Sequence, residues 1–218
     1  MPTTAILVDG SFFLKRYAAT YGLKHSPAQI ASELFTMCIS HLDDKNDLYR
    51  IFFYDCPPIS KKAHNPITGK AIDFSKTDQF AFRMQLHREL VRKRKVALRL
   101  GRLASRGGWI IRPQVTKDLL SGARELASLK ENDVSYDIAQ KGVDMRIGLD
   151  IASLAQKRLV QRIILVTGDA DFVPASKFAR REGIDVILDP MWQAISEDLF
   201  VHIDGLKSVC PRPKPIVP

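Results

Sequence analysis

Short apolar runs alternate with amphipathic stretches along most of the chain. The apolar runs predict strands at residues 5–8, 49–54, 109–111, 162–167 and 184–188, and an alternation of apolar and polar residues predicts a strand at 96–103. Apolar residues at helical spacing predict helices at 11–20, 27–41, 77–95, 142–157, 172–182 and 193–200. Uniformly apolar runs such as 5–8 (AILV) are typical of strands covered on both faces. Because strands alternate with helices, we expect an α/β fold, a three-layer α/β/α sandwich with a mostly parallel central sheet.

Capping residues suggest where the predicted helices begin and end. Ser11 is expected to cap the first helix and Ser26 the second, where Pro27 suits the first helical position. Residues 55–76 contain several prolines and are predicted to form a long loop, a kind of loop that is often functional. Residues 113–138 are ambiguous between helix and loop. The end of the chain (PRPKPIVP) cannot be helical. We therefore expect one domain over residues 1–206 and a proline-rich tail over 207–218.

Composition is that of an ordinary globular domain. The 218 residues are 45% hydrophobic and 26% charged. No apolar run approaches the roughly 20 residues that span a bilayer. Residues 1–4 lack a basic region, which argues against a signal peptide and favours a cytoplasmic location. The three cysteines, Cys38, Cys56 and Cys210, have neither zinc-ligand nor CxxC spacing.

The charge of the chain favours polyanionic partners. The formal net charge is +9 and the sequence pI is about 9.6, which points to nucleic acid first and an anionic membrane surface second. Basic residues are densest between positions 83 and 106, where Glu89 is the one acid. We expect nucleic-acid contacts from Arg83, Arg88, Arg92, Lys93, Arg94, Lys95 and Arg99, with Arg102 and Arg106 beyond them. Phe80 and Phe82 are candidates for stacking on bases. Alternatively, the arginines solvate a helix face and the two phenylalanines belong to the core.

Aspartates follow several of the predicted strands. Asp9 comes directly after the first strand, and Asp169 and Asp171 follow the strand at 162–167. Ligands bind beyond the carboxyl ends of strands in an open α/β sheet, so these acids are candidates for one site. Asp144 lies near a helix start and is favoured over Asp150, which sits about 240° further around the same helix. Converging carboxylates repel one another, and a hard cation such as Mg²⁺ or Mn²⁺ removes that repulsion. Each acid also has a structural explanation, since Asp9 or Asp171 can cap a helix and Asp144 suits a helix start.

Three motifs together resemble a known family. Residues 6–11 (ILVDGS), 141–144 (KGVD) with Asp150 beyond them, and 166–174 (VTGDADFVP) occur in this order. Together with 183–186 (GIDV) they resemble the NYN family of the PIN-like nuclease superfamily, the group that includes the LabA-like proteins. The resemblance extends over most of residues 4–204.

The resemblance implies a three-layer fold and metal-dependent cleavage of RNA. Asp9, Asp144, Asp169 and Asp171 match the acidic positions of the family, as metal ligands and catalytic residues, and Asp150 is a further acidic match. Many relatives have Asn where this chain has Ser11, which can still donate a hydrogen bond. Lys141 is a candidate phosphate contact.

Two other functions remain open at this stage. A phosphatase like the haloacid dehalogenases also places Asp after its first strand, but normally has a second Asp where this chain has Ser11. A PIN-like module that binds RNA or a protein without cutting it fits the basic segment equally well. Homo-oligomerisation is also left open by the sequence.

Overall fold

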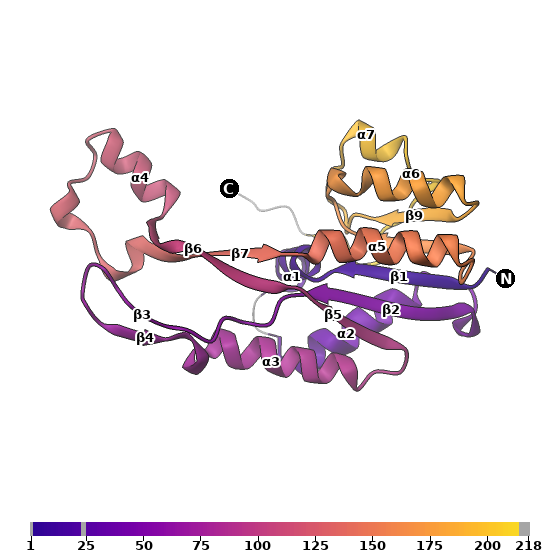
Figure 1. The fold of residues 1–218 in the computed structure, drawn as a ribbon, viewed down its shortest axis with the longest axis horizontal. Coiled ribbons are helices and arrows are strands. Elements are labelled where there is room, and N and C mark those ends of the chain that lie inside the picture. The colour runs from indigo at the N-terminus through magenta and orange to yellow at the C-terminus, as the bar shows by residue number, and fades with distance from the viewer. Residues whose placement is uncertain (1, 23–24, 214–218) are drawn as a thin grey trace.

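The structure is a computed structural model that describes residues 2–22 and 25–213 (Figure 1). Its strands are β1 (Thr4–Asp9), β2 (Leu48–Asp55), β3 (Lys62–His64), β4 (Ala71–Asp73), β5 (Val96–Leu100), β6 (Arg102–Ile111), β7 (Val134–Lys141), β8 (Arg162–Val166), β9 (Asp185–Asp189) and β10 (Gly205–Leu206). Its α-helices are α1 (Gly10–Tyr21), α2 (Pro27–Ile39), α3 (Asp78–Val91), α4 (Pro113–Leu120), α5 (Val143–Gln156), α6 (Val173–Arg181) and α7 (Glu197–Phe200).

Six strands form the central sheet, in the order β10-β9-β8-β1-β2-β5. Every neighbouring pair in this sheet is parallel. The registers place Asp9 beside Tyr54 and Val8 beside Val166, so β1, β2 and β8 end together. We call this end of the sheet the carboxyl edge and the opposite end the amino edge.

Side chains of the central strands alternate between the two faces of the sheet. On β1, Ala5 and Leu7 pack in one core with residues of α5, α6 and α7, whereas Ile6 and Val8 pack in the other with residues of α1, α2 and α3. All four are completely buried. This alternation with a period of two explains why the strand is apolar throughout. The three-layer α/β/α sandwich predicted from the sequence is confirmed.

The capping predictions have mixed outcomes. Ser26 caps α2 and forms a capping box with Gln29, as its position before Pro27 suggested. The prediction for Ser11 is wrong, because α1 begins at Gly10 and its cap is Asp9. The carboxylate of Asp9 accepts hydrogen bonds from the backbone N–H groups of Ser11 and Phe12.

Residues 55–76 and 113–138 both contain short regular elements. Residues 55–76 contain the antiparallel β3–β4 hairpin instead of a structureless loop. Within 113–138 lie α4 and the first part of β7, which pairs antiparallel with β6. The strand predicted at 96–103 divides at Gly101, and the one at 109–111 is the end of β6. We call β3, β4, β6, β7 and α4 the arm; Figure 1 shows it projecting beyond the carboxyl edge.

Several helices are shorter than predicted. Helix α3 ends at Val91 rather than at 95, and Lys95 has a positive φ of 62° just before β5. Helix α7 spans only Glu197–Phe200. Within the predicted tail, Cys210 is buried and its carbonyl accepts a hydrogen bond from Trp192, while 214–218 lie outside the described residues. No helix in the described part of the chain is long and apolar enough to cross a membrane.

Candidate active site at the carboxyl edge

Asp9 is held at the carboxyl edge by its role as a helix cap. Its Oδ1 lies 3.0 Å from the backbone nitrogen of Ser11 and 3.1 Å from that of Phe12. The following Gly10 lets α1 start directly against β2, because a Cβ there would stand 2.6 Å from the carbonyl oxygen of Tyr54. The carboxylate is therefore fixed through one oxygen. Oδ2 accepts no hydrogen bond from any residue that the structure describes.

Asp144 reaches the same region from the start of α5. Gly142 precedes the helix with φ +78°, a left-handed conformation that suits glycine and turns the chain from β7 into α5. Asp144 then falls in the first turn of the helix, where the macrodipole favours a negative charge. Its side chain is exposed.

Asp169 follows β8 and caps a short 3-10 helix, Ala170–Phe172, that contains Asp171. The Oδ1 of Asp169 accepts a hydrogen bond of 3.0 Å from the backbone N–H of Asp171. The backbone N–H of Asp169 in turn donates to the Thr167 hydroxyl at 3.3 Å. Both aspartates are exposed. As at Asp9, a backbone hydrogen bond fixes one oxygen of the Asp169 carboxylate.

The carboxylates are close enough to affect one another's ionisation. The pKa of Asp9 is raised from 3.8 to about 6 in total: burial is the largest cause, the negative charges of Asp144 and Asp169 also raise it, and the two backbone hydrogen bonds lower it. Burial also raises the pKa of Asp144, to which the charges of Asp169 and Asp171 contribute. Acids from three separate segments of the chain thus share one electrostatic environment, and we call Asp9, Asp144, Asp169 and Asp171 the acidic group.

This environment suits a hard divalent cation in its chemistry. The donors are carboxylate oxygens, which Mg²⁺ and Mn²⁺ prefer, and their mutual repulsion would be relieved by positive charge. In the arrangement shown, however, no three His, Cys, Asp or Glu side chains of residues 2–22 and 25–213 are placed to hold one ion together. Binding an ion through three of these carboxylates therefore requires side-chain rotation.

The supporting residues named from the sequence fall in different places. Asp150 accepts hydrogen bonds from the Tyr54 hydroxyl at 2.8 Å and from the Arg99 Nε at 3.0 Å. It is not among the charges that raise the pKa of Asp9 or Asp144. Ser11 is exposed beside Asp9, and Lys141 is exposed at the end of β7, just before Asp144 in the chain. Asp150 is thus engaged with Arg99 rather than with the acidic group.

The basic segment is divided between the two edges of the sheet. Arg92, Lys93, Arg94 and Lys95 lie in the turn before β5, whose first residue pairs with Ile51, so this turn is at the amino edge. Lys93 bonds to the Ser32 hydroxyl and Lys95 to the Leu48 carbonyl. Exposed Arg88 lies on α3, which leads to that turn. Arg83 and Arg99 lie toward the carboxyl edge, where Arg83 pairs with Asp55 and Arg99 with Asp150.

Asp55 is a residue of this edge that the sequence analysis did not single out. It ends β2, is completely buried, and accepts hydrogen bonds from Arg83 at 2.8 Å and from His87 at 2.7 Å. Its other oxygen, Oδ1, is buried without a hydrogen-bond partner among the described residues. The available signal was the same as for Asp9, an acid directly after an apolar strand. Phe82, by contrast, packs against the core, as the alternative interpretation held.

A six-stranded parallel sheet between two helical layers, with carboxylates at its carboxyl edge, defines a fold of the PIN-like nuclease class. The family model of the NYN domain matches residues 66–200. Since this is more than half of the chain, the protein belongs to the NYN family of the PIN-like superfamily. The matched range contains Asp144, Asp169 and Asp171, whereas Asp9 precedes it.

Other comparisons add little to this. No curated protein matches the chain. Among solved structures, the chain is similar to a protein of unknown function from Vibrio parahaemolyticus, at 16% sequence identity and a TM-score of 0.48. The similarity covers 95% of this chain and 92% of the other.

Proposed function

We propose that this protein is a divalent-metal-dependent ribonuclease, with residues 1–206 as its catalytic domain. The observation that carries the proposal is the shared electrostatic environment of Asp9, Asp144, Asp169 and Asp171, in a chain of a nuclease-like family. Acids that raise one another's pKa destabilise the metal-free protein, which is the expected state of a site built for a cation.

Each acid has a proposed role. Asp9 and Asp169 would hold Mg²⁺ or Mn²⁺ directly, and Asp144 and Asp171 would bind the ion or orient its waters. When bound, such an ion lowers the pKa of water and stabilises negative charge on a phosphate. The chain's own contribution is to orient Asp9 and Asp169, so the rotation that a third ligand requires would fall to Asp144 or Asp171. Since backbone N–H groups hold the Oδ1 atoms of Asp9 and Asp169, their Oδ2 atoms remain as the ligand oxygens.

Charge supports a nucleic-acid substrate, and membership of the NYN family is the reason to propose RNA in particular. Four carboxylates repel a phosphate backbone, so a substrate must be attracted from outside the acidic group. A net charge of +9 supplies that attraction. Lys141, exposed three residues before Asp144 in the chain, is the proposed phosphate contact nearest to the acids.

The test is a cleavage assay on labelled single-stranded and structured RNA, and on DNA of the same sequence, with Mg²⁺, Mn²⁺ or a chelator. We expect cleavage of RNA with metal and none with the chelator. Asp169→Asn should lower the rate by more than roughly 100-fold, since loss of a direct ligand exceeds loss of an outer-shell partner. Asn can still accept the hydrogen bond from Asp171, so the variant should fold. Asp150→Asn is the matched control, because Asp150 lies apart from the acidic group.

Three results would count against the proposal. Full activity in a folded Asp169→Asn variant would rule out these acids as the catalytic site. RNA binding without cleavage under either metal would favour the non-cleaving module. Hydrolysis of small phosphate esters in place of RNA would favour a phosphatase.

A further inference from the structure

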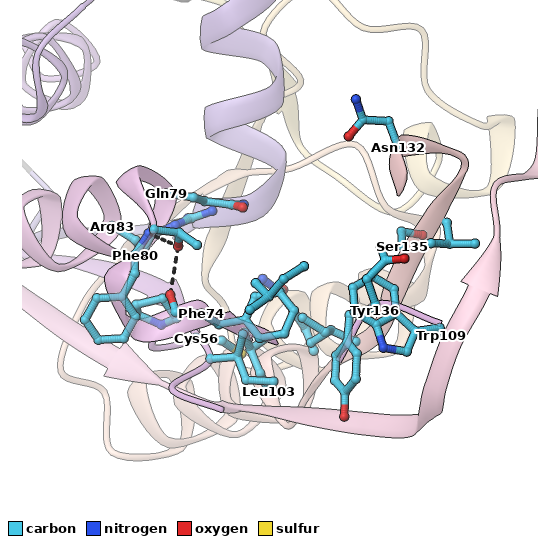
Figure 2. Close-up of a pocket in the computed structure, with 18 of the residues that line it drawn as sticks. Cys56, Phe74, Gln79, Phe80, Arg83, Leu103, Trp109, Asn132, Ser135 and Tyr136 are labelled. Atoms are coloured by element: carbon cyan, nitrogen blue, oxygen red, sulfur yellow. Dashed lines mark hydrogen bonds between the residues drawn. The ribbon is translucent and has the colours of Figure 1, made fainter. Parts of the chain in front are cut away.

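A cleft opens between the arm and the start of α3, beyond the carboxyl edge. Its volume is about 510 Å³, and it is lined by residues of the segments 55–83, 103–112 and 131–140. Figure 2 shows Phe80 and Arg83 on one side and Trp109, Tyr136 and Ser135 on the other, with Phe74 between them. None of the four aspartates lines the cleft, but it begins at Asp55 and Cys56, directly after the β2 residue that pairs with Asp9, and it ends at Gln140, four residues before Asp144 in the chain.

Aromatic rings form one wall of the cleft. The centroid of Tyr136 lies 5.3 Å from that of Phe74 and 5.5 Å from that of Trp109, which it meets edge to face at 84°. Phe74 and Trp109 are 6.5 Å apart. Each of the three rings is only half-buried, so the cluster joins the β3–β4 hairpin to β6 and β7 and still presents aromatic surface to the cleft. Such surface can stack on nucleic-acid bases.

Polar groups around the aromatic wall match the other parts of a nucleotide. Exposed amide side chains of Gln79, Asn132 and Gln140 line the cleft and can bond to base edges. Arg112 is exposed on its rim. Arg83 is held in place by buried Asp55, and this fixed guanidinium can meet a phosphate or stack on a base.

The arm is also a source of positive charge. Residues 57–77 and 101–142 together carry eleven Lys and Arg residues and six Asp and Glu residues. Lys61 lies 5.3 Å from the centre of the Tyr136 ring, and it lowers the pKa of that phenol. A polyanion is therefore attracted to the wall where the aromatic rings are found.

We propose that this cleft binds unpaired bases of single-stranded RNA whose backbone runs on to the acidic group. This inference rests on the proposed function for what happens at the acids, but not for the binding itself. Single strands are specified because the bases of a duplex are stacked on one another and paired at their edges. Only unpaired bases can offer both a free face to Trp109 and a free edge to the amides.

The experiment measures binding of end-labelled RNA by fluorescence anisotropy, in chelator so that no cleavage occurs. Trp109→Ala should weaken binding of a single-stranded oligonucleotide by about 5- to 100-fold, the range that base stacking supplies. An abasic oligonucleotide of equal length has the same phosphates but no bases. Trp109→Ala should leave its affinity unchanged. Trp109→Phe retains an aromatic ring and should restore most of the affinity for the base-containing strand.

Tryptophan fluorescence gives a second readout. The chain has two tryptophans, so the difference between wild type and Trp109→Phe reports on Trp109. We expect RNA to quench this component and the abasic strand to leave it unchanged. An RNA duplex of the same sequence should bind equally to wild type and Trp109→Ala.

Failure of this inference can be told from failure of the proposed function. If Trp109→Ala weakens the abasic strand as much as RNA, the ring is only structural and the inference is overturned. Unchanged RNA affinity in Trp109→Ala also overturns the inference, and a polypeptide would then be the better candidate ligand for the cleft. Base-dependent binding in a protein that never cleaves RNA would sustain the inference and reject the nuclease.

Discussion

The Arg83 guanidinium donates a hydrogen bond of 2.8 Å to the Asp55 carboxylate at the point where β2 leaves the sheet. Asp55 is completely buried, whereas the Arg83 side chain remains 24% exposed. The pair therefore joins the carboxyl edge to the cleft of the arm. His87 shares the same carboxylate oxygen, so one buried charge fixes two side chains of α3.

Removing this carboxylate should destabilise the protein. Asp55→Ala leaves Arg83 and His87 without their partner, and breaking a buried ion pair from one side costs about 3 kcal/mol or more. Urea unfolding should show this loss as a lower midpoint. Arg92→Ala, which breaks the exposed pair with Glu89, is the matched control and should change stability by less than about 1 kcal/mol. Equal effects of the two variants would mean that the buried pair stabilises the protein no more than an exposed pair does.

In the metal-free protein, the charge of Asp9 should lower the free energy of unfolding at neutral pH relative to a variant without that charge. Its pKa rises from 3.8 to about 6 on folding, so the folded state binds this proton more tightly than the unfolded chain. The resulting stabilisation is complete below pH 3.8 and is lost as the pH rises through 6. Asp9→Asn keeps a cap acceptor and removes the charge. The stability of the variant relative to wild type should therefore increase as the pH rises from about 4 to 6. At pH 7 the variant should be more stable by an amount on the order of 1–3 kcal/mol.

A control with the opposite sign is available at Asp73. Hydrogen bonds from Ser75 hold the pKa of this exposed carboxyl below its usual value. Its contribution to stability is present above the unfolded pKa and is lost as the pH falls through the folded value. Asp73→Asn should therefore be less stable than wild type at neutral pH, and the difference should vanish in acid. Parallel pH curves for wild type and Asp9→Asn would contradict the role assigned to Asp9.

Divalent ions should raise the melting temperature. An ion that binds only the folded state stabilises it by mass action, which at ten times its dissociation constant is about 1.4 kcal/mol, or roughly 3–6 °C for a chain of this size. Thermal melts with millimolar Mg²⁺ or Mn²⁺ test this. Asp9→Asn should reduce the shift, and Asp150→Asn should preserve it. No shift together with no heat of binding by calorimetry would argue against the metal site.

The two basic regions should differ in their effect on nucleic-acid binding. Replacing Lys61 and Arg112 by Gln removes charge at the cleft. The slope of log affinity against log salt concentration for a single strand should then become shallower by roughly 0.7 for each phosphate that the variant no longer neutralises. Replacing Arg92 and Arg94 by Gln removes equal charge at the amino edge. For a short oligonucleotide, this second variant should bind as wild type does. If the change at Arg92 and Arg94 weakened binding and the change at Lys61 and Arg112 did not, the nucleic acid would bind at the turn formed by residues 92–95 instead.

The sequence alone determined the layers of the fold, and it was sufficient to predict that Asp9 and Asp169 lie at the carboxyl edge. Burial on both faces makes a parallel strand uniformly apolar, so β1, β2 and β8 were recognisable from composition over a few residues. An acid after such a strand must lie at the carboxyl edge, which is why Asp9 and Asp169 could be named. The cap by Ser26 was equally local, since Pro27 and Gln29 are its neighbours.

Only the tertiary structure showed how the arm is formed, that Asp55 is buried and paired with Arg83, and that the basic segment is divided between the two edges of the sheet. The strands β6 and β7 pair residues that lie far apart in the chain, such as Arg102 with Lys141, and no short window contains that pairing. The aromatic cluster likewise needs Phe74 and Tyr136 to meet across a distance set by the folded chain. Helix α3 runs from the carboxyl edge to the amino edge, so arginines adjacent in the sequence end at opposite sides of the sheet. Local patterns record which face a residue covers, whereas the partner it meets there is fixed by packing between segments that are distant in sequence.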